Sequence, residues 1–154
     1  VRRTGDIVIL SIHWGGNWGY DIPEAWRRFA HRLIDLESVD LIHGHSSHHP
    51  KGLELYRDRL ILYGCGDLIN DYEGIGGHEE LRPELGLLYF ATIDAGTGRL
   101  EALEMLPTRL HNFRLNRAGR EDAQWLHKTL DRESRRQGTR IDLGEDGVLN
   151  LRKL

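Results

Sequence analysis

The chain has 154 residues, of which 39% are hydrophobic and 29% charged, a balance typical of one globular domain rather than a disordered or fibrous chain. The formal net charge is -3 and no long Lys/Arg run occurs, which argues against a general nucleic-acid binder. No stretch of about 20 apolar residues is present, so the sequence predicts no membrane span. The single cysteine, Cys65, excludes an internal disulfide.

The first predicted element is a strand. Residues 6–12 form an almost continuous apolar run rich in β-branched side chains, which is typical of a buried strand in a sheet covered on both faces. This run follows the first residue so closely that we expect the chain to be part of a longer protein. An apolar sheet edge at residues 7–12 would then be open to self-association.

A helix and a second strand come next. Asp21 offers an N-cap, Pro23 lies in the first turn and Glu24 is placed as a capping-box partner. Apolar side chains follow at three- and four-residue spacing, at Ile22, Trp26, Phe29, Leu33 and Leu36. Residues 39–42 form a second short strand that leads into His43.

The middle of the chain predicts three more strands. Residues 59–63 form one of them, and the acidic, glycine-rich residues 71–84 are read as a loop. Residues 87–93 and 100–106 form two strands joined by a hairpin turn at residues 94–98. The alternation of strands and helices indicates an α/β protein with parallel or mixed sheets.

The last third predicts a helix and a terminal hairpin. The helix runs over about residues 120–136 and ends at Gly138. Residues 140–143 and 148–151 form two strands around the turn at residues 144–147. No internal repeat, low-complexity tract or linker interrupts the sequence, so we expect residues 1–154 to form a single domain.

Histidines gather where the predicted strands end. Five of the nine lie at or just beyond strand ends: His13, His43, His45, His48 and His49. Loops at the carboxyl ends of strands are where open α/β sheets bind ligands, and imidazole is a common ligand of Zn, Mn and Fe. The cluster therefore predicts a metal site. An isolated histidine is more often solvated or bonded to a carbonyl, which is our interpretation of the histidines outside this cluster and His13.

Asp67 ends the third strand and reaches the same edge. With Asn70 and Asp71 it could orient an imidazole or face a metal-bound water, or it could cap a turn. Glu54 could hydrogen-bond a ligating histidine or be solvated. Nothing marks Cys65 as a nucleophile, because no basic residue stands beside it.

Four segments together resemble a known family. They are residues 6–15 (DIVILSIHWG), residues 40–45 with His48, residues 60–67 and residues 112–115. In order and spacing they are similar to the CapA family, bacterial proteins of capsule and poly-γ-glutamate synthesis related to the calcineurin-like metallophosphoesterases. The resemblance implies a four-layer α/β/β/α sandwich with mixed sheets and a two-metal centre between the strand ends.

The resemblance also implies roles for individual residues. His13, His45 and His48 would bind divalent metal ions, expected to be Mn, Zn or Fe. His43, His49 and Asp67 would act beside the metals, as proton donors or as groups that orient the ligands. The activity implied is a metal-dependent phosphoesterase-type hydrolysis of an anionic small molecule or polymer. Members of the family are commonly found in the cell envelope.

Three departures from the family pattern bear on this expectation. Two residues separate His45 from His48 where one is usual, and Ser46 stands where many members carry histidine, so the pair could instead involve His43 or His49. Asp67 stands where asparagine is frequent.

The family's first metal ligands precede the position of His13, and residues 1–12 do not contain them. The chain therefore resembles the C-terminal half of the fold, with a site completed by upstream residues. The alternative is a non-catalytic polymer-binding or assembly module that keeps the fold.

Overall fold

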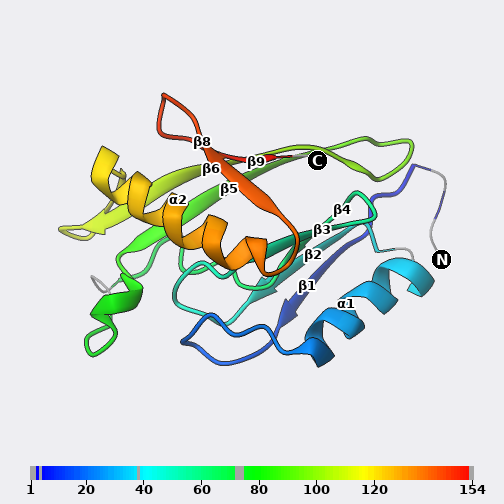
Figure 1. Cartoon of the computed structure of the whole chain (residues 1–154), viewed down its shortest axis with the longest axis horizontal. Coiled ribbons are helices and arrows are strands. Elements are labelled where there is room, and N and C mark those ends of the chain that lie inside the picture. The colour runs from blue at the N-terminus through cyan, green and yellow to red at the C-terminus, as the bar shows by residue number, and fades with distance from the viewer. Residues whose placement is uncertain (1–2, 4, 38, 72–74, 153–154) are drawn as a thin grey trace.

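The computed structural model describes residue 3 and residues 5–37, 39–71 and 75–152, and shows a mixed α/β chain with two sheets and two α-helices (Figure 1). The elements in chain order are β1 (Ile9–His13), α1 (Glu24–Glu37), β2 (Leu41–His45), β3 (Leu53–Tyr56), β4 (Arg59–Leu62), the 3-10 helix η1 (Glu79–Leu81), β5 (Leu85–Ile93), β6 (Leu100–His111), β7 (Arg114–Arg117), α2 (Arg120–Arg135), β8 (Arg140–Leu143) and β9 (Leu149–Arg152).

The first sheet is mixed and has the order β1-β2-β4-β3. β1, β2 and β4 run parallel, and β3 pairs antiparallel with β4. Side chains alternate along a strand, so the two faces of this sheet belong to two separate clusters of buried residues. Ile42 and Ile61 pack with Ala30 of α1 on one face. Leu41 and Leu60 belong to the cluster on the other face. The central strands are therefore buried on both faces.

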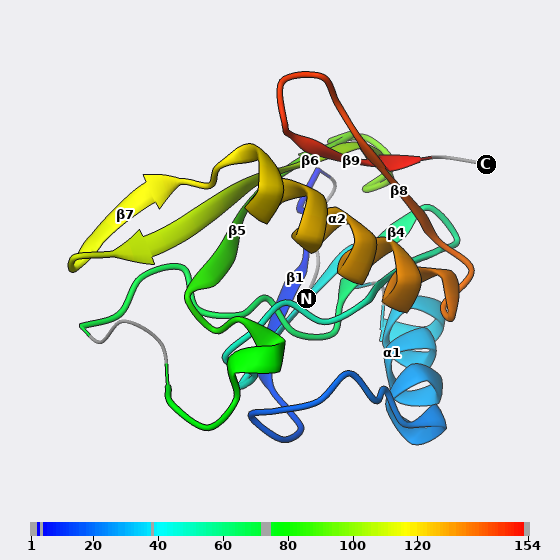
Figure 2. The same cartoon turned by 60° about the vertical axis from the view of Figure 1, so that its left-hand side comes forward.

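The second sheet is antiparallel, with the order β5-β6-β9-β8 and β7 attached to β6. Met105 and Leu149 of this sheet are completely buried and share one cluster with Leu60 of the first sheet and Leu126 of α2. The main core thus lies between the two sheets and α2, and α1 lies on the other side of the first sheet (Figures 1 and 2).

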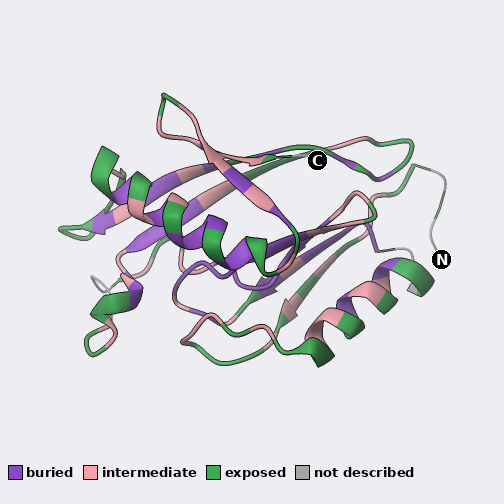
Figure 3. Cartoon of the chain, in the orientation of Figure 1, coloured by how far each residue is buried: buried purple, intermediate pink, exposed green. Residues whose placement is uncertain are grey.

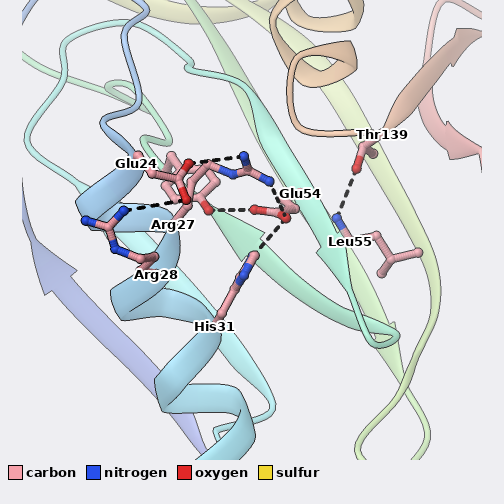
Figure 4. A network of polar contacts seen from close by, with 8 residues as sticks. Glu24, Arg27, Arg28, His31, Glu54, Leu55 and Thr139 are labelled. Carbon is pink, nitrogen blue, oxygen red and sulfur yellow. Dashed lines mark hydrogen bonds and ion pairs between the residues drawn. The ribbon is translucent and has the colours of Figure 1, made fainter.

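Side chains from the end of α2 and the turn after it cover the free edge of β3. Ser134 Oγ accepts a hydrogen bond from the backbone N–H of Leu53 at 3.2 Å, and Thr139 Oγ1 accepts one from Leu55 at 3.0 Å (Figure 4). This satisfies N–H groups that an edge strand would otherwise expose, and it ties α2 to the first sheet.

Two expectations about burial are wrong. β1 is an edge strand with alternating exposure rather than a strand covered on both faces, and Ile9 is 59% exposed. On α1, Phe29 and Leu36 are 46% and 66% exposed, and Ala30 and Ile34 are buried in their place (Figure 3). Phe29 keeps only a partial contact, with the Trp14 ring edge-on at 6.2 Å. Whether copies associate through the edge of β1 stays a prediction, which size-exclusion chromatography would test.

The remaining elements agree well with the sequence. The expected strands around β4, β5, β6, β8 and β9 and the helix α2 are confirmed. β3 and β7 were not expected, and the predicted loop at residues 71–84 contains η1, with residues 72–74 outside the described residues. α1 begins at Glu24, so Asp21 is not its N-cap. Neither described helix is long and apolar enough to cross a membrane.

Candidate functional site

Strand register places three of the predicted histidines beside one another. His13 of β1 stands opposite His45 of β2, and Ser11 stands opposite His43 in the same parallel pair. The ring centroids of His13 and His45 are 5.2 Å apart with an edge-to-face geometry, and those of His43 and His45 are 5.8 Å apart. We call His13, His43 and His45 the histidine trio.

The trio is open to solvent and rich in nitrogen donors. His13 and His45 are exposed, while His43 is half-buried and shares a 3.0 Å hydrogen bond between its Nδ1 and Ser11 Oγ. Burial, with a smaller contribution from the neighbouring charge of His45, lowers the pKa of His43. A lowered pKa keeps the imidazole neutral, which is the form that can bind a metal.

His48 lies beside the trio but has partners of its own. Its Nδ1 is 3.0 Å from Asp67 Oδ2, and its Nε2 is 3.3 Å from the amide nitrogen of Asn17. With the proton on Nδ1, the ring donates to Asp67 and accepts from Asn17. Asp67 thus orients the imidazole, which is one of its three sequence interpretations, while Asn17 occupies the lone pair that a metal would need. Asn70 donates to the same Asp67 oxygen at 3.3 Å.

His49 lies in the loop after β2 and is buried rather than facing solvent. It is 0% exposed, its Nδ1 donates to Pro50 O at 3.2 Å, and the Tyr20 ring packs edge-on against it at 4.7 Å. Burial lowers the pKa of His49 to about 4. Its Nε2 is buried and has no hydrogen-bond partner within the described part of the chain. A neutral, buried ring packs the loop, and its nitrogen does not reach the surface where the trio lies.

Two loops carry these side chains and hold each other in place. Ser46 has a backbone φ of 128°, a strained value for a residue with a side chain, and its Oγ donates to Gly15 O at 2.9 Å. The backbone N–H of His48 also donates to Asn17 O at 3.0 Å. The site is therefore built from the ends of β1 and β2 and from the two loops that follow them, and hydrogen bonds hold these loops together.

Gly44 leaves space for the side chain of Trp14. It lies inside β2, and a Cβ there would come within 2.4 Å of Trp14 Nε1 and 2.5 Å of Leu62 O. Trp14 Nε1 donates to Tyr63 O at 3.0 Å, and the ring stacks on Trp26 with centroids 5.5 Å apart. Trp14 therefore covers the core beneath the site, and only glycine leaves room for it.

Sequence reasoning missed several residues of this edge. Asn17 is not part of any motif that would have indicated a site. His78 was interpreted as a histidine that is solvated or bonded to a carbonyl. In the structure the His78 ring stacks on Trp18 with centroids 3.9 Å apart, and Trp18 also lies 5.2 Å from the His48 ring. Trp18 thus lies between the rings of His48 and His78.

Two other candidates lie away from the trio or are inert. Glu54 is a buried residue of β3 on the side of the first sheet that faces α1. It accepts hydrogen bonds from Tyr63 Oη at 2.6 Å and His31 Nε2 at 2.9 Å (Figure 4). It bonds none of the histidines predicted as ligands. Cys65 is buried, and burial raises its pKa to about 12, so its thiol stays protonated. Asp71 is exposed.

The donor set fits a divalent transition metal in part. Neutral imidazoles are suitable ligands, and the contact between His48 and Asp67 is the kind of outer contact that metal-binding histidines make. Among the described residues, however, no group of three or more His, Cys, Asp or Glu side chains is arranged to hold a metal ion.

Comparison with known proteins covers the whole of this edge. The family model described as "Bacterial capsule synthesis protein PGA_cap" matches residues 1–72, which include the trio, His48, His49 and Asp67. The chain is 52% identical over 150 residues to a probable polyglutamine synthesis accessory protein of Mycobacterium tuberculosis, covering 97% of this chain and 39% of that protein. It is 26% identical over 150 residues to the PGA biosynthesis protein CapA of Bacillus subtilis, covering 97% of this chain and 37% of that protein.

A shorter match, 24% identical over 70 residues, links the chain to the capsule biosynthesis protein CapA of Bacillus anthracis and covers 46% of this chain and 17% of that protein. The chain spans about two fifths of the length of the first curated relatives that it matches, which are the Mycobacterium tuberculosis proteins. The family model, these identities and the motifs at the strand ends agree, and the chain belongs to the CapA family of bacterial capsule synthesis proteins.

Proposed function

We propose that this chain supplies the histidine-bearing part of a metal-dependent phosphoesterase-type hydrolase site in a CapA protein of capsule or polyglutamate synthesis. The observation that carries the proposal is the contact between His13 and His45, whose rings lie side by side at the ends of adjacent parallel strands. In this proposal the two sheets and two helices are part of a four-layer α/β/β/α sandwich, and segments outside these 154 residues supply the remaining ligands.

In the proposed site His13, His45 and His48 hold the metal. A bound divalent ion would polarise an anionic oxygen of the substrate and lower the pKa of a water. Asp67 fixes the orientation of the His48 ring through Nδ1, and Asn17 must leave Nε2 before His48 can bind a metal. His43 lies within reach of the same space and is held by Ser11, so it positions a substrate or donates a proton to a leaving group.

The proposal is tested by measuring the metal content of the full-length protein by elemental mass spectrometry. His13→Ala and His45→Ala should each remove at least half of the bound Mn, Zn or Fe. His111→Ala is a matched control, because His111 is also exposed and ends β6 in the other sheet, and it should leave metal content unchanged. Unchanged metal content in both test variants would refute the proposal.

One observation favours a second candidate, a non-catalytic polymer-binding or assembly module. The described residues lack a three-ligand group, and the lone pair of His48 is taken by Asn17. Phosphodiesterase assays with added Mn or Zn separate the two candidates. Turnover that is lost in His45→Ala supports the hydrolase, and no turnover with any metal supports the module.

A further inference from the structure

A second cluster of basic and polar side chains belongs to the hairpin of β6 and β7. Figure 2 shows the backbone of this hairpin. The antiparallel register pairs Arg109 with Asn116 and His111 with Arg114. Since these pairs are two residues apart along each strand, all four side chains lie on the same face of the hairpin. With Asn112 and Arg117 they line a hollow of about 620 Å³. Arg117 pairs with Thr108, so along the strand it alternates with Asn116 and reaches the hollow from the other face of the hairpin. We call these six lining residues the arginine face.

The backbone that carries the arginine face is tightly turned and braced. Asn112 and Phe113 have φ values of 51° and 54°, the left-handed pair of a two-residue hairpin turn. The side-chain amide of Asn116 donates to Arg114 O on the same strand at 2.8 Å and to His111 O across the turn at 3.5 Å. The hairpin therefore presents its guanidinium groups from a fixed backbone, which lowers the entropy cost of binding.

Two of the three arginines of this face form no ion pair with a carboxylate of the described residues. No carboxylate in the described part of the chain forms an ion pair with Arg114 or Arg117, and Arg117 donates only to the backbone oxygen of Asp146. Arg109 does pair with Asp122 at 3.2 Å, but Asp122 is shared with Arg82. Among the described residues, no acidic side chain lines the hollow itself.

Arg120 extends the positive charge beyond the hairpin. It is the first residue of α2, where the positive end of the helix dipole makes a cation unfavourable, and it lines the next hollow together with Arg117 and the acidic residues Glu145 and Asp146. Arg114, Arg117 and Arg120 thus follow one another at three-residue spacing in a chain whose net charge is -3. A bound anion would offset the mutual repulsion of these cations.

We propose that the arginine face binds a polymer that carries repeated carboxylates. Guanidinium groups match planar carboxylates in geometry, and each exposed ion pair contributes little by itself, so useful affinity needs several contacts in a row. A glutamate polymer has this chemistry. The choice of glutamate rests on the proposed function, whereas the site itself rests on the geometry of the hairpin and does not involve the histidine trio.

Fluorescence polarisation with a labelled glutamate polymer at low salt tests the inference. The double variant Arg114→Ala/Arg117→Ala should weaken binding at least about tenfold, which corresponds to about 1.4 kcal/mol. A glutamine oligomer of the same length has no charge and should not bind. Raising the salt concentration should weaken the binding of the glutamate polymer, because the contacts are exposed ion pairs.

Matched variants keep the result specific. Arg28→Ala/Arg32→Ala removes two exposed arginines from α1 and should leave binding unchanged, and circular dichroism should show that every variant is folded. Metal content should stay unchanged in Arg114→Ala/Arg117→Ala, so loss of metal and loss of polymer binding are separate outcomes. Equal binding by the hairpin variant, equal loss in the α1 variant, or equal binding of the glutamine oligomer would each overturn the inference.

Discussion

The buried carboxylate of Glu54 should be the polar group whose removal costs this fold most. Its side chain is 5% exposed and accepts hydrogen bonds from Tyr63, His31 and, at 3.4 Å, Arg27 (Figure 4). Burial, and then the hydrogen bond with Glu54, raises the pKa of Tyr63 well above its ordinary value. Burial acts to lower the pKa of Arg27, but the hydrogen bond and charge of Glu54 outweigh this and raise it. Glu54 therefore fixes α1 on the first sheet.

The magnitude follows from what Glu54→Ala would leave behind. Removing one partner of a buried, hydrogen-bonded pair costs about 3–5 kcal/mol, because the other groups stay buried without compensation. In a chain of this size each kcal/mol lowers the melting temperature by about 2–4 °C, so Tm should fall by roughly 6–20 °C. Tyr63→Phe removes a single hydrogen bond to a charged group and should cost about 1.5–3 kcal/mol.

Thermal and urea unfolding followed by circular dichroism measures these costs. Glu24→Ala is the matched control, since Glu24 also pairs with Arg27 but its side chain is 62% exposed. A surface pair of this kind should contribute no more than about 0.5 kcal/mol. If Glu54→Ala proved no more destabilising than Glu24→Ala, the claim that Glu54 holds α1 in place would be wrong.

Three further predictions concern single positions. Gly44→Ala should destabilise the fold by about 3 kcal/mol or more and red-shift Trp14 fluorescence, because the new methyl group displaces the indole; an unchanged emission spectrum would contradict this. Burial raises the pKa of Cys65 to about 12, so iodoacetamide at pH 8 should label it only after unfolding, as mass spectrometry would show. Hydrogen bonds from the Thr97 side chain and backbone lower the pKa of Asp94, so its stabilisation is complete above the unfolded pKa and is lost as pH falls through the lower folded value. Asp94→Asn should therefore flatten the loss of stability below about pH 4 in urea titrations, and an unchanged acid limb would argue against this role.

The candidate site was predictable to the extent that it depends on strand ends. Because the carboxyl ends of parallel strands share one edge, the positions of His13 and His45 in sequence were sufficient to expect them together, and the register confirms it. The histidines that follow β2 could not be assigned in this way. His48 and His49 are neighbours in sequence but have different surroundings. His48 hydrogen-bonds Asp67, whereas His49 is buried and packs against Tyr20. That difference depends on how two loops pack, which no local pattern encodes.

Local patterns in the sequence were enough to determine the α/β class, the helix α2, the main strands and the family. These features follow from the spacing of apolar residues and from short motifs, which act over a few residues. Tertiary structure alone decided that Phe29 and Leu36 face outward, that Glu54 belongs to a buried network, and that Arg114 and Arg117 share one open hollow. Each of these depends on contacts between segments distant in the chain, since burial and charge pairing are properties of the assembled fold.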